Sequence, residues 1–258
     1  MRREYDNLQL IRSHGFTGYP HDVVRPLGYS CRLNSVLVEE HRSEQTLSSI
    51  MSQSICQRRP DWLYEKLTAL AYFLATFHNR TANGRGVRFH RDCALLDSLV
   101  ATLFHQRVIR REEVKELSWL RDRWREQPRM WEDQEVLVHG DATPSNFLFG
   151  EGLSVVGIDL ENMMRADRVF DVGRIAGELQ HFFLQLENDK QAAEPFIGHF
   201  LWEYACHFPD RDRAFQSITG RAPFQMGLTL LRNARNSWLG PEHRRRLVEE
   251  AKTTLRTF

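Results

Sequence analysis

Polar side chains follow each of three short apolar segments in the middle of the chain. These segments are 136–138, 147–149 and 153–158. They are rich in β-branched or aromatic residues and too short for helices, so we expect buried strands. His139, Asp141 and Asn146 lie in the loop between the first two strands, and Asp159 follows the third. Mg²⁺ binds a few hard oxygen atoms and keeps some of its waters, and an amide oxygen with a carboxylate at neighbouring strand ends would supply such ligands.

The spacing Asp141-x-x-x-x-Asn146 resembles the catalytic loop of protein kinases. In that loop the Asp accepts the proton of the attacking hydroxyl and the Asn binds magnesium, and a later Asp also binds the metal. The ion neutralises the negative charge that phosphoryl transfer spreads over the phosphate oxygens. By this resemblance we expect Asp141 to be the catalytic base, and Asn146 and Asp159 to be metal ligands. An alternative role for Asp159 is the cap of a following helix, but its position at the end of a strand favours the metal.

The segment His-Gly-Asp-x-x-x-x-Asn at 139–146, followed by Ile158-Asp159, resembles the Brenner motif of the aminoglycoside phosphotransferase family. That family includes choline and homoserine kinases and shares the protein-kinase fold. Further segments resemble its hinge strand, its Leu-Ala-x-Leu-His helix and its Asp-Ile-Gly element, in this order, at 34–40, 70–78 and 167–173. The resemblance implies a small-molecule kinase that uses ATP or GTP with Mg²⁺.

The resemblance also implies supporting roles around the loop. His139 is expected to hold the loop by hydrogen bonding, and Asp171 to anchor it from the next helix. Glu161 is expected to assist the metal or a cationic substrate, or else to be a solvated loop carboxylate. The backbone groups expected to contact adenine are those of Val38, Glu39 and Glu40.

The surrounding elements predict an α+β, protein-kinase-like fold with two lobes. We expect a truncated N-terminal lobe with the hinge at 1–41, made of a helix and a short antiparallel sheet, and a mostly helical lobe with the catalytic and metal-binding loops at 42–258. Strands of a hairpin are expected at 22–29 and 32–39. Helices are expected at 4–14, from 46, at 61–80 with Asp61 as N-cap, at 92–107, at 111–125, and beyond 168, where Gly220 and Gly240 divide them.

The Gly-rich loop and the phosphate-binding lysine of the family have no counterpart before the first helix, and the first lysine is Lys66. We therefore expect this chain to be a poor kinase by itself. We also expect that the natural gene product either starts further upstream or has lost activity. Glu4 would be either the glutamate that pairs that lysine or a surface charge. Leu8 and Ile11 are expected to be partly exposed, because the covering strands are missing.

An alternative of another class is a catalytically inactive, kinase-like binding protein. The missing loop and lysine favour it, whereas the presence of Asp141, Asn146 and Asp159 opposes it. A hydrolase has little support, since the sequence has neither a Ser or Cys elbow nor a cluster of metal-binding histidines. The acceptor stays open between an amino alcohol, an amino sugar, another sugar and homoserine.

Composition indicates an ordinary globular protein of the cytoplasm. The 258 residues include 27 % charged and 41 % hydrophobic residues, and the net charge of +1 does not indicate nucleic acid or an anionic membrane as partner. The four cysteines are scattered, which is typical of a reducing compartment. The sequence has neither the apolar core of a signal peptide nor an apolar run of about 18 residues that would span a membrane. The oligomeric state is not predicted.

Overall fold

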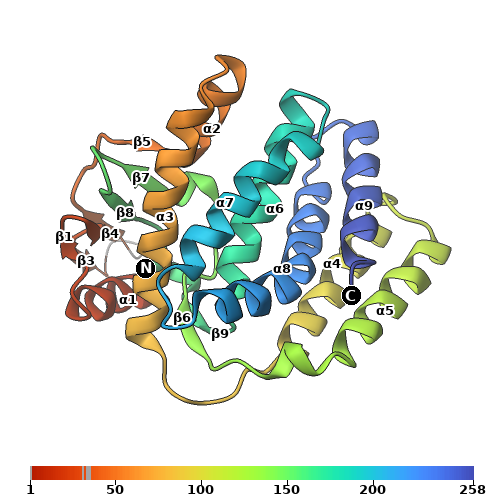
Figure 1. Cartoon of the computed structure of the whole chain (residues 1–258), viewed down its shortest axis with the longest axis horizontal. Coiled ribbons are helices and arrows are strands. Elements are labelled where there is room, and N and C mark those ends of the chain that lie inside the picture. Colours follow the sequence, from red (N-terminus) through yellow and green to blue (C-terminus); the bar gives the residue numbers. More distant parts are fainter. Residues whose placement is uncertain (1, 31, 33–35) are drawn as a thin grey trace.

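A computed structural model describes residues 2–30, 32 and 36–258 of the chain (Figure 1). The α-helices are α1 (Arg2–Ser13), α2 (Leu47–Cys56), α3 (Pro60–Thr81), α4 (His90–His105), α5 (Arg111–Arg125), α6 (Val169–Leu186), α7 (Glu194–Ala205), α8 (Arg211–Ala234) and α9 (Pro241–Leu255). The strands are β1 (Thr17–Gly18), β2 (His21–Val23), β3 (Pro26–Ser30), β4 (Val36–Glu39), β5 (Gln45–Thr46), β6 (Val136–Val138), β7 (Phe147–Phe149), β8 (Val155–Gly157) and β9 (Met164–Ala166). This is an α+β fold in which helices dominate.

The central sheet joins the N-terminal segment to the middle of the chain. Its strand order is β1-β2-β8-β7-β5, with β2 parallel to β8 and the other neighbours antiparallel. Strands β3 and β4 form a separate hairpin, and β6 pairs with β9. Strands β6, β7 and β8 are buried along their whole length, in agreement with the short apolar segments that predict them.

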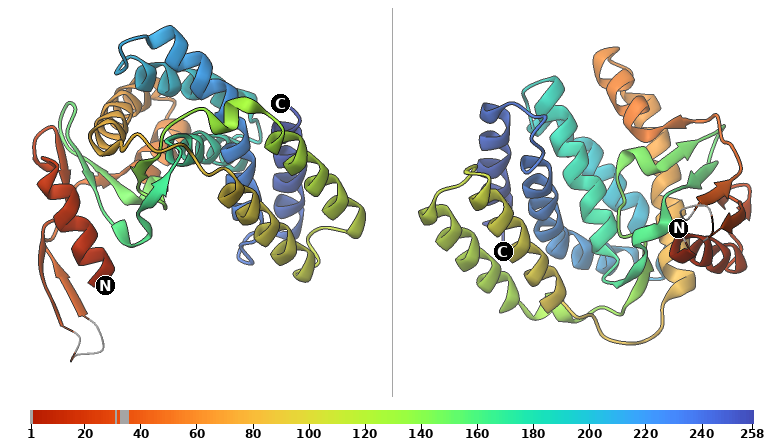
Figure 2. Two further views of the ribbon diagram at one scale, coloured as in Figure 1. Left: turned by 90° about the horizontal axis from the view of Figure 1, so that it is seen from below. Right: turned by 180° about the vertical axis from the view of Figure 1, so that it is seen from behind.

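Two groups of elements lie at opposite ends of the molecule, and three helices lie between them. Helix α1 and the β3–β4 hairpin are at one end, and α4, α5, α8 and α9 are at the other, with α3, α6 and α7 between them (Figures 1 and 2). One hydrophobic core continues from α1 through α3 to α6 and α7, and a second lies among α4, α5, α8 and α9. No helix in the described part of the chain is long and apolar enough to span a membrane.

Helices α1 and α4 each begin two residues earlier than expected, and two further differences have a local cause. Helix α3 begins at Pro60 with Arg59 as its N-cap, so Asp61 lies in the first turn and is not the cap. Proline is favoured there because its missing N–H has no partner in a first turn anyway. Gly220 lies inside α8, which also continues through Pro223. A glycine costs a helix only about 1 kcal/mol, and the packing of α8 against α6 and α9 outweighs it.

The N-terminal segment differs from expectation in its strands and in its burial. The predicted strand at 22–29 is two strands, because Val24 hydrogen-bonds to Gly157 at the end of β8 and the chain turns into the hairpin at Pro26. Most of the turn between the predicted hairpin strands lies outside the described residues, including Asn34 and Ser35 of the hinge segment. The expectation for Leu8 and Ile11 is wrong: both are fully buried in the core that α3 and the sheet form.

Candidate active site

The loop that carries Asp141 is in direct contact with the loop that carries Asp159. Gly140 has a positive φ of 80°, and a Cβ atom at this position would lie 2.1 Å from the backbone oxygen of Asn162. A side chain is thus excluded both by the left-handed conformation and by the close approach. Farther along the same loop, the Ile158 N–H donates to the backbone oxygen of Asn146 at 3.1 Å. These contacts bring Asp141, Asn146 and Asp159 to one place.

Asp171 fixes the backbone of the first loop from the first turn of α6. Its carboxylate is fully buried and accepts hydrogen bonds from the N–H groups of His139 (2.6 Å) and Gly140 (3.1 Å). His139 holds the same loop with both ring nitrogens: Nε2 donates to the Ile158 carbonyl at 2.9 Å, and Nδ1 faces the Asp141 N–H at 3.4 Å. Neither nitrogen is left for proton transfer, which fits the supporting role expected of His139.

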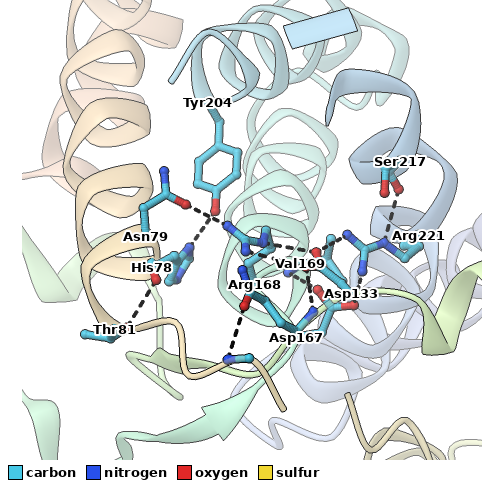
Figure 3. Close-up of polar contacts among 12 residues, drawn as sticks. His78, Asn79, Thr81, Asp133, Asp167, Arg168, Val169, Tyr204, Ser217 and Arg221 are labelled. Atoms are coloured by element: carbon cyan, nitrogen blue, oxygen red, sulfur yellow. Dashed lines mark hydrogen bonds and ion pairs between the residues drawn. The ribbon is translucent and has the colours of Figure 1, made fainter. Parts of the chain in front are cut away.

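Two further residues, for which the sequence predicts no role, support Asp171. His78 Nε2 lies 3.1 Å from the Asp171 carboxylate. On the other side of the ring, His78 Nδ1 lies 2.7 Å from the Tyr204 hydroxyl (Figure 3). Since the carboxylate can only accept, Nε2 donates and Nδ1 accepts from the hydroxyl. Burial lowers the pKa of His78, although Asp171 opposes this shift, so the ring is neutral in this chain of bonds. His78 ends the Leu-Ala-x-Leu-His segment, whereas nothing in the sequence indicates Tyr204.

A group of buried ion pairs lies beside this chain of bonds. Arg168, at the start of α6, and Arg221, on α8, both contact Asp133, and Arg221 also contacts Asp167 (Figure 3). Burial alone would raise the pKa of Asp133, but the two guanidinium groups hold it below its ordinary value. The start of α6 is therefore fixed to α8 as well as to the catalytic loop.

Asn146 and Asp159 both have oxygen atoms available to a ligand. The Asn146 amide nitrogen donates to the Asp141 backbone oxygen at 2.9 Å, which leaves the amide oxygen for another partner. Asp159 has a left-handed backbone conformation with φ of 60°, and its side chain makes no capping bond to the short helix that follows. The alternative role of Asp159 as a helix cap therefore has no support in the geometry.

The site around Asp159 carries an excess of negative charge. Burial raises the pKa of Asp159, and the carboxylates of Glu161 and Asp141 raise it further. Burial, Glu39 and Asp159 raise the pKa of Glu4 to about 7. A cation between these groups would relieve their repulsion. The residues therefore fit Mg²⁺ bound by one amide and one carboxylate with waters, although the described residues contain no metal-binding group of three or more His, Cys, Asp or Glu.

The hinge residues lie at the end of β4. Val38 is half exposed. Burial and the Asp159 carboxylate raise the pKa of Glu39, and Glu39 in turn contributes to the raised pKa of Glu4. The Glu40 N–H already donates to the Arg25 carbonyl at 3.0 Å, and its side chain accepts from the Arg25 N–H. Of the backbone groups expected to contact adenine, the Glu40 N–H is thus occupied within the hairpin.

The sequence also gives no indication of Arg174, which reaches the site from α6. Its Nη2 atom lies 2.7 Å from Oδ1 of Asp141, and its side chain is only 7 % exposed. Arg174 follows Asp171 by three residues, so both side chains project from neighbouring positions of one helix face. Asp171 fixes the backbone of the loop, and Arg174 fixes the side chain of its predicted base.

Comparisons with known proteins agree with this geometry. The sequence model of the phosphotransferase enzyme family matches residues 1–207. A search among curated proteins finds no matching sequence. Among solved structures, similar folds include glucosamine kinase in complex with glucosamine, ADP and inorganic phosphate (TM-score 0.60, 16 % identity, 98 % of this chain and 67 % of that chain). The gentamicin complex of APH(2'')-IIa has a TM-score of 0.57 at 13 % identity, over 98 % and 79 % of the two chains.

An ethanolamine kinase from Plasmodium vivax has a TM-score of 0.54 at 15 % identity, over 98 % of this chain and 71 % of that chain. Identities this low establish the fold alone, and that fold is the two-lobed kinase fold with a small sheet in its N-terminal lobe. The family match is independent of these structures and includes every predicted site residue. The chain therefore belongs to the phosphotransferase enzyme family.

Proposed function

We propose that the protein transfers the γ-phosphoryl group of ATP or GTP to a hydroxyl of a small molecule, with Mg²⁺. One observation carries this proposal: the contact between two loops that gathers Asp141, Asn146 and Asp159 within one acidic site. Residues 1–41 would contribute the hinge toward the nucleotide, and residues 42–258 the catalytic loops.

Each site residue has a separate task in the proposed reaction. Asn146 and Asp159 would hold the magnesium ion, which neutralises charge on the phosphate oxygens when bound. Asp141 would orient the acceptor hydroxyl and accept its proton. The acceptor oxygen forms a bond to the γ-phosphorus, the bond from that phosphorus to the bridging oxygen breaks, and the electron pair leaves on the nucleoside diphosphate.

The acceptor class is supported by the fold relatives. The kinases among them are a glucosamine kinase, an ethanolamine kinase and a choline kinase. Each of the three compounds combines a nitrogen atom with a hydroxyl. We therefore propose an amino sugar or an amino alcohol before a simple sugar or homoserine. Glu161, an exposed carboxylate beside Asp159, is a candidate contact for such a positively charged group.

The test of the metal site is a thermal-shift titration with Mg²⁺ and ATP or GTP. At about 100 times its Kd a nucleotide should stabilise the parent chain by roughly 2.7 kcal/mol, and Asp159→Ala should abolish the magnesium-dependent part. Glu151→Ala, which removes an exposed acid from the loop between β7 and β8, is the matched control and should behave as the parent. Equal shifts for Asp159→Ala and the parent would show that the metal assignment is wrong.

A second variant separates binding from chemistry. Asp141→Asn should bind Mg²⁺ and nucleotide as the parent does, but it should lower turnover of an accepted amino sugar or amino alcohol by about 10²–10⁴-fold, the usual contribution of a general base. Turnover equal to that of the parent would remove Asp141 from the role of base.

A further inference from the structure

Arg174 carries hydrogen-bonding capacity that the folded chain does not use. One nitrogen, Nη2, contacts Asp141, but Nε and Nη1 are buried and have no hydrogen-bond partner in the described part of the chain. A guanidinium group has five N–H donors and no acceptor. Leaving charged donors buried without partners is strongly unfavourable, and such groups in native proteins call for a ligand, water or ion as partner.

The backbone next to Arg174 is held in place by its neighbours on α6. The adjacent Gly173 packs so tightly on α8 that a Cβ atom there would lie 2.6 Å from the Gln225 side chain. Asp171 ties the same turn of α6 to the catalytic loop through His139 and Gly140. These contacts fix the part of α6 from which the Arg174 side chain extends to Asp141.

Asp141 keeps one oxygen for the acceptor while it is paired with Arg174. The contact uses Oδ1, which leaves Oδ2 for the proton of the acceptor hydroxyl. An acceptor hydroxyl bound at Oδ2 would bring the transferred phosphoryl group beside the carboxylate that Arg174 contacts. The planar guanidinium matches the geometry of phosphate oxygens, and it can donate two bonds to them at once.

We propose that Arg174 is a catalytic residue whose guanidinium group binds the oxygens of the phosphoryl group during its transfer. The inference rests on the proposed function. Asn146 and Asp159 would serve the phosphates through the metal, and Arg174 would approach the transferred group from α6. Negative charge on its peripheral oxygens would be stabilised by a cation whose side chain is largely buried, while the bonds that form and break are those given above.

The experiment uses aluminium fluoride as a stand-in for the transferred group, so that no acceptor has to be known. Melting curves of the full chain are measured with Mg²⁺·ADP alone and with Mg²⁺·ADP plus aluminium fluoride. Arg174→Met should keep the affinity for Mg²⁺·ADP but bind aluminium fluoride roughly ten- to a hundredfold more weakly, as expected for the loss of hydrogen bonds to a charged group. Arg174→Lys should recover part of this affinity, because it keeps the charge without the planar fork.

Arg88→Met is the matched control. Arg88 pairs with Glu135 at 2.7 Å outside the site, so this variant should keep the binding of both ligands. If Arg174→Met unfolds, Arg174→Lys alone decides, because a binding of aluminium fluoride equal to that of the parent would overturn the proposal. If a folded Arg174→Met binds aluminium fluoride as tightly as the parent, the proposal is overturned as well. The partner of the Arg174 donors would then be an anionic group of the acceptor. If the parent itself does not bind Mg²⁺·ADP, the proposed function fails, and the inference fails with it.

Discussion

The two sides of the candidate active site differ in how their polar groups are paired. Behind the catalytic loop, Asp171, His78 and Tyr204 are fully buried, and each finds a hydrogen-bond partner within the chain. On the side of α1, burial and the carboxylates of Glu39 and Asp159 raise the pKa of Glu4, and burial with the carboxylates of Glu161 and Asp141 raises the pKa of Asp159. The bonds among these three residues are complete in the folded chain, whereas the side of α1 is electrostatically unfavourable until a cation binds.

This difference separates stability from function. A completely bonded buried network holds the loop in one geometry and contributes to the free energy of unfolding. Repelling carboxylates lower that free energy and are retained where a ligand uses them. Removing a group from the first side should therefore destabilise the chain strongly, whereas neutralising a group on the second side should stabilise it.

The largest effect is expected for Asp171→Ala. The change leaves the N–H groups of His139 and Gly140, and Nε2 of His78, without an acceptor in a dry interior. Unsatisfied buried groups cost about 1–3 kcal/mol each, so a loss of about 3–5 kcal/mol is expected in urea unfolding. Asp189→Ala is the control, since Asp189 is exposed and accepts one hydrogen bond, from the Gln191 N–H. A loss as small as in the control would mean that Asp171 does not anchor the loop.

A smaller effect is expected for Tyr204→Phe. It removes one hydroxyl and leaves Nδ1 of His78 without a donor, at a cost of about 1–2 kcal/mol. Tyr64→Phe removes the hydroxyl of a partly buried tyrosine whose ring stacks on Phe196 in the same core, and should change the free energy of unfolding much less. If the two variants lose the same free energy of unfolding, the hydrogen bond between Tyr204 and His78 does not contribute the expected stability.

The smallest effect, of opposite sign, is expected for Glu4→Gln. With a pKa of about 7 in the folded chain against 4.5 ordinarily, Glu4 keeps a proton that the unfolded chain has already lost. Stability should therefore fall as the pH rises from 4.5 through 7, and Glu4→Gln should remove this part of the decline. Because Glu4 is partly exposed, the gain at pH 8 should be only about 0.5 kcal/mol, or roughly 1–2 °C in Tm.

Melting curves at pH 4 and pH 8 test this sign directly. The variant and the parent should melt together at pH 4, where Glu4 is protonated in both states. Saturating Mg²⁺ should reduce the difference at pH 8, because a cation near Asp159 offsets the repulsion. A variant that is less stable than the parent at pH 8 would show that Glu4 has a favourable partner.

The sequence is informative where a feature depends on neighbouring residues. The buried strands β6, β7 and β8 follow from short apolar runs, and the family follows from the ordered motifs around Asp141. The sequence is less informative where a feature depends on packing. Tyr204 is 126 residues from His78, and Arg174 meets Asp141 only because α6 presents one particular face to the loop. No local periodicity encodes such a rotation of one helix against a distant loop.

The expectation that Leu8 and Ile11 are exposed is wrong for a related reason. It treats the missing strands as the only cover for α1, whereas the core around α3 buries both side chains. The local composition of α1 predicts a helix with one apolar face, and the tertiary fold decides what lies against that face.

The pairing of β2 with β8 and of β5 with β7 has a consequence for motion. The β2–β8 pair joins residues on both sides of position 41, and the β5–β7 pair extends the same sheet, so β2 and the strand that leads to Asp159 have to move together. Among the described strands before position 41, β3 and β4 form a hairpin that is separate from this sheet. We expect adjustment to ligands of different size to occur by bending of the hairpin about Val24 and Arg25, so that the opening of the site changes while the distance between Asp141 and Asp159 stays constant.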